Sequence, residues 1–97
     1  MRGNAGTSYT SSSGTRVLEV LKALKGHTIT GLSNQELAKA LGHSPSAITR
    51  SLAELIEAGL AIKLDNGRFA HSVAMLQIAQ AHAEHCARIQ NRIAVIS

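Results

Sequence analysis

The sequence predicts a small, mainly α-helical domain with one β-hairpin, followed by a long C-terminal helix. Three observations lead to this prediction. Two segments with helical apolar spacing, residues 33–41 and 44–58, are joined by a very short connection. A stretch that alternates apolar and polar residues follows, interrupted by the turn sequence Asp-Asn-Gly at residues 65–67. Residues 72–93 then contain no helix breaker and again show an apolar stripe with helical spacing.

The bulk properties of the chain limit its possible functions. Its 97 residues suffice for one domain with a single core, and no apolar run approaches membrane-spanning length. The N-terminus has no apolar leader segment and Cys86 has no second cysteine to pair with, so we expect a reducing cytoplasm. The net charge of +4 is compatible with a polyanionic partner. Because single-strand binding usually requires exposed rings and the chain has only one Tyr and one Phe, duplex DNA is the favoured nucleic acid.

A tail and a first helix are expected at the start of the chain. Residues 1–14 are rich in serine, threonine and glycine, with almost no apolar side chains, which predicts a disordered tail. A first helix is expected from Arg16 to about Lys25, with Thr15 as its N-cap and Gly26 ending it. Its valines and leucines follow helical spacing, so one face should pack on a core.

The next segment combines a predicted strand with a well-marked helix start. Residues 27–32 are too short for a helix, and the β-branched Ile29 between two threonines predicts a short strand. Ser33 and Glu36 have the spacing of a capping box, in which each side chain accepts a hydrogen bond from the other residue's backbone N–H. Gly42 is expected to end this helix in a left-handed conformation.

Another helix should start directly after Gly42. Ser44 suits the N-cap position and Pro45 the first helical position, where its missing N–H costs nothing. Gly59 is expected to terminate this helix. The apolar side chains expected to face the core are Ile48, Leu52, Leu55 and Ile56.

The alternating stretch that follows predicts a β-hairpin. Residues 60–64 are expected to form a half-buried strand, and residues 68–70 the return strand, with Phe69 directed into the core. Two helices joined by so short a turn make a helix-turn-helix, and the hairpin after them makes the motif a winged one. In such motifs the second helix commonly enters the major groove of DNA.

Residues 72–97 are expected to form a long helix beyond the domain of residues 15–71. Apolar residues cover about half of its circumference, which is wider than one small core requires. Exposed apolar surface of this extent usually marks an interface, so we expect a homodimer formed through this helix; the alternative is simple packing of the helix on its own domain. The expected interface residues are Leu76, Ala79, Ala83, Cys86, Ile89 and Ile93.

Base-reading residues are expected in the first half of the helix that follows Ser44. Arg50 is the principal candidate because a guanidinium group can bond to both O6 and N7 of guanine. The alternative is an ordinary surface charge paired with Glu54, one helical turn away. The candidate set is Ser46, Ala47, Thr49 and Arg50, with Ala47 lying against a thymine methyl group.

Phosphate contacts are expected at two places in the motif. The N-terminus of the helix that starts after Ser33 presents free backbone N–H groups, and the hairpin can reach an adjacent backbone or the minor groove. For the hairpin, a purely structural role is an equal alternative. The candidates are Ser33, Asn34, Gln35, Lys39, Ser44, Lys63, Asn66 and Arg68.

Other chemistry has little support in the sequence. His82, His85 and Cys86 form an H-x-x-H-C cluster, but they are too few for structural zinc unless a dimer supplies a second pair. We therefore expect ordinary helix residues here, with no metal and no cofactor. Asp65 is the single aspartate and lies in the hairpin turn, and there is no glycine-rich phosphate loop, so an enzyme is not expected.

Residues 15–83 resemble the N-terminal winged helix-turn-helix domain of IclR-type bacterial transcriptional regulators. The similar segments are RVLEVLKAL, LSNQELAKALG and SPSAITRSLAELIEAGLA, and the most specific element is the spacing of Ser46 and Arg50 followed by an L-x-x-L motif. The hairpin and the segment GRFAHSVAMLQIA are similar to the family's last strand and its linker helix. The resemblance implies a dimer that reads an inverted repeat, with Ser46, Thr49 and Arg50 at the DNA.

The resemblance stops after the linker helix. We identify no small-molecule effector site, and a short stand-alone version suits a phage or bacterial regulator; MarR-like winged helices share much of the pattern. The leading hypothesis is a small dimeric regulator that occupies an operator by sequence-specific binding to duplex DNA. The alternative is a winged-helix module that binds another protein, which the weak net charge and the acidic far half of the second motif helix favour.

Overall fold

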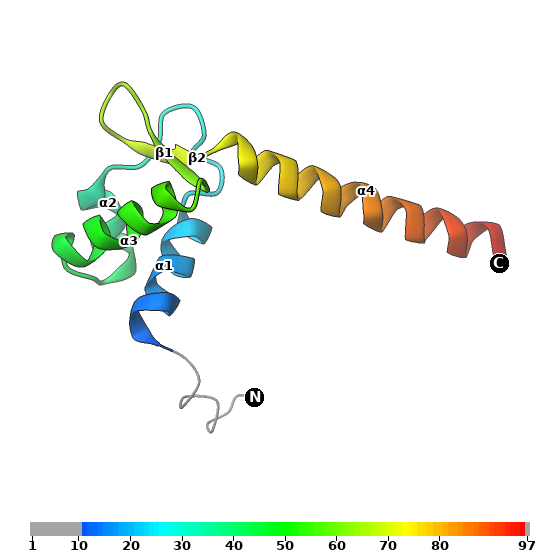
Figure 1. The fold of residues 1–97 in the computed structure, drawn as a ribbon, viewed down its shortest axis with the longest axis horizontal. Coiled ribbons are helices and arrows are strands. Elements are labelled where there is room, and N and C mark those ends of the chain that lie inside the picture. The colour runs from blue at the N-terminus through cyan, green and yellow to red at the C-terminus, as the bar shows by residue number, and fades with distance from the viewer. Residues whose placement is uncertain (1–10, 97) are drawn as a thin grey trace.

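A computed structural model describes residues 11–96 as a small helical body from which one long helix extends (Figure 1). In order, the elements are α1 (Ser12–Ala23), α2 (Asn34–Leu41), α3 (Pro45–Glu57), β1 (Ala61–Lys63), β2 (Phe69–His71) and α4 (Val73–Ile96). This confirms the predicted fold class, a mainly helical winged helix-turn-helix followed by a C-terminal helix. The first ten residues of the predicted tail lie outside the described part of the chain.

Helix α1 begins earlier than the sequence predicts. Ser11 is the N-cap, and its hydroxyl oxygen accepts a hydrogen bond from the Gly14 N–H at 2.9 Å. The predicted start at Arg16 with Thr15 as cap is therefore wrong, and residues 12–14 of the predicted tail are helical. The physical reason is that a capped first turn needs no apolar side chains, so this Ser/Gly-rich segment carries no hydrophobic signal.

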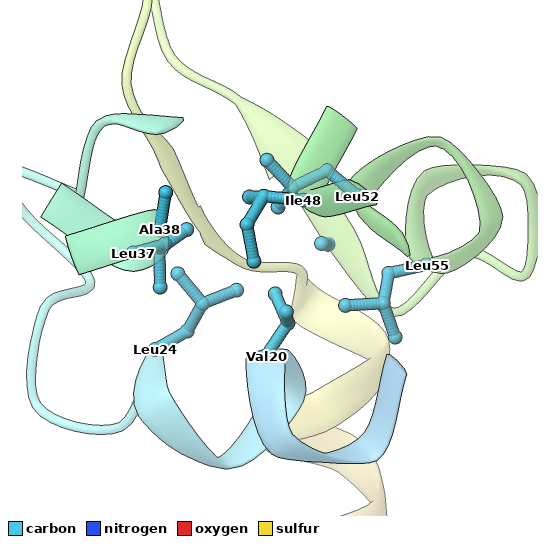
Figure 2. Close-up of a cluster of buried hydrophobic side chains, with 8 residues drawn as sticks. Val20, Leu24, Leu37, Ala38, Ile48, Leu52 and Leu55 are labelled. Atoms are coloured by element: carbon cyan, nitrogen blue, oxygen red, sulfur yellow. The ribbon is translucent and has the colours of Figure 1, made fainter. Parts of the chain in front are cut away.

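The core lies where α1, α2 and α3 meet (Figure 2). Val20 enters it from α1, Leu24 from the C-cap of that helix and Leu37 from α2, and all three side chains are fully buried. Ile48, Leu52 and Leu55 complete it from α3, as predicted, each at most 2 % exposed. Ile56 is the exception in the predicted stripe, because it lies at the edge of the buried face and is 40 % exposed. Phe69 packs against the core while partly buried, which confirms its predicted direction.

The strand predicted for residues 27–32 is wrong. A turn closed by the hydrogen bond from Gly31 N–H to His27 O, at 2.9 Å, occupies this segment, and Ile29 is 89 % exposed. Only Leu32 has strand-like pairing, as an isolated bridge to Phe69 with both N···O distances at 2.9 Å. β-branched residues favour strands through packing, and here Ile29 has no surface to pack on.

The hairpin forms as predicted and also anchors α4. Strands β1 and β2 are antiparallel, with Ile62 opposite Ala70. His71 reaches from β2 to α1, where its Nε2 lies 2.7 Å from the Leu21 carbonyl oxygen. The Ser72 N–H donates to Leu60 O at 3.0 Å immediately before α4 begins. The hairpin therefore sets the point and direction at which α4 leaves the body.

Gly31 is a position where a side chain cannot be accommodated. Its φ is +74°, and a Cβ atom would lie 2.8 Å from the Phe69 carbonyl oxygen. Gly67, in the hairpin turn, has a similar φ of +85° but open space where a Cβ would stand. We expect Gly67→Ala to lower the free energy of unfolding by about 1–2 kcal/mol from backbone strain alone, and Gly31→Ala to lower it further because the Leu32–Phe69 pairing must also shift. Urea unfolding of both variants checks this; equal losses would show that the close approach at Gly31 is unimportant.

Candidate nucleic-acid interface

The α2–turn–α3 unit has the caps that the sequence predicts. Ser33 and Glu36 form a complete capping box, with the Ser33 N–H donating to the Glu36 carboxylate at 2.9 Å. Gly42 ends α2 with a φ of +74°. Ser44 then caps α3 by accepting a hydrogen bond from the Ala47 N–H at 3.2 Å, and Pro45 takes the first helical position. These caps fix where both helices start, which keeps the turn short.

A hydrogen-bonded tie fixes α2 and α3 relative to one another. The Asn34 amide donates to Thr49 Oγ1 at 2.8 Å and to the Pro45 carbonyl oxygen at 3.1 Å. The Thr49 hydroxyl in turn donates to the same carbonyl at 3.0 Å. Both residues were predicted as DNA contacts, one for phosphate and one for bases. Their polar groups are already paired within the protein, so their first role is to hold the angle of α3.

A second set of contacts, between α1 and α3, was not predicted from the sequence. The Arg16 guanidinium donates through Nε to Ser51 Oγ at 3.0 Å, and Ser51 is completely buried. His43, in the turn, places its Nε2 atom 2.9 Å from Oε1 of Glu19 in α1, within hydrogen-bond distance. Ser51 itself could have indicated this contact, because it is a polar residue next to Leu52 on the buried side of α3. Buried hydroxyl groups require a hydrogen-bond partner, which here is Arg16.

The exposed side of α3 carries the remaining base-reading candidates. Arg50 is exposed and, in the part of the chain that the structure describes, its side chain makes no hydrogen bond or ion pair, so the alternative pairing with Glu54 is not formed. Ser46, one turn earlier, is also exposed, with its hydroxyl 3.3 Å from that of Ser44. The predicted exposure of Ala47 is wrong, because its side chain is only 7 % exposed. Ala47 therefore offers little surface for the contact with a thymine methyl group, which stays a prediction.

The hairpin candidates differ from one another in what they contact. Arg68 is occupied: its Nε donates to the Gly31 carbonyl oxygen at 3.2 Å and its Nη2 to the Glu36 carboxylate. Asn66 donates to Thr30 O at 3.2 Å and accepts from the Arg68 N–H at 2.9 Å. These two residues tie the hairpin to the start of α2, the structural alternative considered from sequence. The hairpin cation that faces solvent is Lys63, whose Nζ lies 5.9 Å from the Phe69 ring centroid.

The two remaining phosphate candidates lie on α2. Gln35 and Lys39 are one helical turn apart and both exposed, and neither side chain has a hydrogen bond or ion pair within the described residues. The structure therefore leaves Gln35, Lys39, Ser46, Arg50 and Lys63 available for an external ligand. The other candidates, Asn34, Thr49, Asn66 and Arg68, make hydrogen bonds that hold α2, α3 and the hairpin together.

The sequence of this unit is similar to a known family. Residues 31–61 match the winged helix-turn-helix DNA-binding family. The matched segment starts at Gly31 and includes both helices of the motif and the first residue of β1. No curated protein matches the chain. The winged helix-turn-helix is thus shown by both fold and sequence over the segment that contains Arg50.

Glu36 links the cap of the winged helix-turn-helix to its wing. The hydrogen bond from the Ser33 N–H, and next the positive charge of Arg68, hold the pKa of Glu36 below its ordinary value despite partial desolvation. When the pKa of a carboxyl group is lower in the folded state than in the unfolded state, its negative charge stabilises the fold at pH values above the unfolded-state pKa. This stabilisation is lost as the pH falls through the lower, folded-state pKa.

The pH dependence of stability tests this link. We expect Glu36→Gln to be less stable than wild type near neutral pH, because it loses the charge that faces Arg68 and Ser33. The difference between the two proteins should shrink as the pH is lowered into the range where Glu36 protonates. Urea unfolding at a series of pH values measures both. A difference that stays constant down to acid pH would contradict the role of the Glu36 charge.

The histidine and cysteine cluster of α4 was considered from the sequence as a metal site. His82 and Cys86 lie one turn apart, with Nε2 and Sγ separated by 3.7 Å. Residues 11–96 contain no group of three or more histidine, cysteine, aspartate or glutamate side chains placed to hold a metal ion. Over the same residues, α4 included, no helix has the length and apolar character needed to cross a membrane.

Proposed function

We propose that this protein is a dimeric, sequence-specific duplex-DNA-binding regulator that acts by occupying an operator. The observation that carries the proposal is the position of Arg50. Its guanidinium group is exposed and makes no hydrogen bond or ion pair with the residues that the structure describes. It lies on the second helix of a segment that matches a DNA-binding family. A guanidinium group held on a helix that enters the major groove can bond to O6 and N7 of one guanine. As a non-enzymatic regulator of DNA, the protein would act inside the cell.

The surrounding residues support Arg50 in this role. Ser46 lies one turn nearer the N-terminus of α3 and can donate to a base edge or a phosphate. Gln35 and Lys39 on α2 and Lys63 on the wing are exposed, and in this proposal they would contact the phosphate backbone of the DNA. Because the Asn34–Thr49 tie fixes α3 against α2, phosphate contacts by α2 would set the position of Arg50 in the groove.

Helix α4 supports the dimer. Leu76 is 60 % exposed, Ile78 57 % and Ile89 42 %, and α4 projects away from the helical body (Figure 1). Large apolar side chains exposed along one helix favour association with a second helix. A dimer would read an inverted repeat, as the resemblance to IclR-type regulators implies. We expect Ala83→Glu, which puts a charge in the middle of this surface, to give a monomer in sedimentation equilibrium while the body stays folded.

Selection of bound sequences from a pool of random duplexes tests the proposed function. We expect an enriched inverted repeat that contains guanine in each half-site, with affinity that falls as salt concentration rises. Enrichment of a single half-site would retain DNA binding but contradict the dimer. The absence of salt-dependent binding to any duplex would overturn the proposal and favour the alternative, a winged-helix module that binds another protein.

A further inference from the structure

An apolar groove lies at the point where α4 leaves the helical body. It is formed between the C-terminal end of α1 and the first turns of α4, which diverge from the hairpin in Figure 1, and it has a volume of about 580 Å³. Leu21 lines the groove from α1, and Met75, Leu76 and Ala79 line it from one face of α4. Small-molecule sites are typically concave, mainly apolar and of roughly 300–1,000 Å³. The groove has the size and the lining of such a site.

The formally charged side chains that line the groove are both lysines. Lys22 lies in the last turn of α1 and Lys25 in the turn that follows it. Both are exposed, and neither ammonium group makes an ion pair or a hydrogen bond within the described residues. Glu19, the acidic residue of α1, does not line the groove, and its carboxylate lies 2.9 Å from His43 Nε2 instead. An anionic group in the groove would therefore meet two cations and no carboxylate.

The walls of the groove favour an aliphatic ligand. Its apolar lining consists of leucine, methionine and alanine side chains, and none of the lining residues is phenylalanine, tyrosine or tryptophan. A nucleobase or another planar ring would lack the aromatic side chain on which such rings usually stack. The unbranched side chain of Met75 can adapt its shape to a flexible aliphatic chain. The lining therefore matches a small amphipathic anion, with an aliphatic chain for the walls and a carboxylate for the lysines.

We infer that this groove binds a small aliphatic carboxylate, of the kind of a medium-chain fatty acid anion, with its chain against Met75 and Leu76 and its carboxylate at Lys22 and Lys25. The apolar chain would supply most of the affinity, because ion pairs with exposed ammonium groups contribute little each. The site was not predicted from the sequence, because its residues come from two segments far apart in the chain. It goes beyond the proposed function and does not depend on DNA binding.

The groove overlaps the expected dimer surface only in part. Leu76 and Ala79 belong to both. The remaining residues of that surface lie further along α4, outside the groove; they are Ala83, Cys86, Ile89 and Ile93. A dimer formed through these distal residues would leave the groove accessible to a ligand.

A nuclear magnetic resonance titration of the full chain tests the site. Octanoate and 1-octanol have aliphatic chains of nearly equal length, but only octanoate carries a charge. We expect both to shift the backbone amide signals of residues 21–28 and 72–79, since both chains would enter the groove. Octanoate should bind more tightly than 1-octanol, by about two- to fivefold for each lysine that it contacts.

A charge variant tests the role of the two lysines. We expect the double variant Lys22→Gln and Lys25→Gln to bind octanoate only as tightly as 1-octanol, with its affinity for 1-octanol unchanged. The double variant Arg88→Gln and Arg92→Gln is the matched control, because it removes the same charge from exposed positions on α4 outside the groove. This control should keep the preference for octanoate. Circular dichroism verifies that both variants are folded.

Three results would overturn the inference. Equal binding of octanoate and 1-octanol by the wild-type protein, or an unchanged preference in the lysine variant, would refute the carboxylate site. Signal shifts centred on residues 83–93 would show adsorption to the exposed face of α4 rather than binding in the groove. An absence of groove shifts in a protein that sedimentation equilibrium shows to be a dimer would indicate that the second copy covers the groove. Binding of the selected operator without octanoate tests the proposed function separately.

Discussion

Arg50→Ala is expected to lower affinity for the selected operator by about 1–3 kcal/mol, or roughly 5- to 150-fold. The guanidinium group is exposed and no described side chain engages it, so its removal should leave the fold unchanged and delete only contacts to DNA. The loss should be concentrated on one guanine, because a bidentate pair discriminates against other bases. Fluorescence anisotropy with the operator and with duplexes substituted at single positions measures both effects.

Arg88→Ala is the matched control for Arg50→Ala. Arg88 is also an exposed arginine on a helix, but it lies on α4, outside the winged helix-turn-helix. Both variants lower the net charge equally, so a general electrostatic effect would weaken binding by both. We expect Arg88→Ala to change affinity only slightly. Equal losses from the two substitutions would show that Arg50 contributes charge rather than base recognition.

Leu52→Ala is expected to lower the free energy of unfolding by about 2–5 kcal/mol. Leu52 belongs to the α3 face of the core and is 1 % exposed, so the substitution removes buried methyl groups and leaves a cavity in the cluster that also contains Val20, Leu37 and Leu55. Small domains have total stabilities of about 5–15 kcal/mol, so this one change would remove a large share. Urea unfolding followed by circular dichroism measures the loss.

Leu18→Ala makes the same chemical change outside the core. Leu18 belongs to the apolar pattern of α1 but is 59 % exposed. Its truncation removes little buried surface, and alanine is the better helix former, so stability should change by less than about 1 kcal/mol. If the two leucine substitutions had similar costs, the core would not be centred where α1, α2 and α3 meet.

The sequence predicts the elements of this fold where local chemistry alone determines them. The capping box at Ser33, the left-handed Gly42 and the Ser44–Pro45 start of α3 each depend on neighbours within four residues, and all three are confirmed. The α3 stripe is also a local pattern, and it is correct except at its last member. The hairpin turn belongs to the same group. Local rules fail at Ile29, because a single strand-forming residue cannot make a strand without a surface to cover it.

The candidate site was less predictable because its decisive contacts join residues far apart in the chain. Nothing near Arg68 in the sequence shows that its guanidinium group reaches Gly31 and Glu36 rather than solvent. The same holds for Asn34 and Thr49, whose polar groups look available until α2 and α3 are packed together. Ala47 shows how a small error in the rotation of a helix turns an exposed residue into a buried one. Arg50 was predicted correctly as an exposed residue because it lies opposite the apolar stripe.

The point at which α4 leaves the body has a consequence for the DNA that the proposed dimer could read. The hairpin fixes this point through the contacts of His71 and Ser72. The way in which two α4 helices pair would therefore set the separation and orientation of the two Arg50 side chains. In the proposed dimer, the spacing of the half-sites in the selected operator reports this geometry.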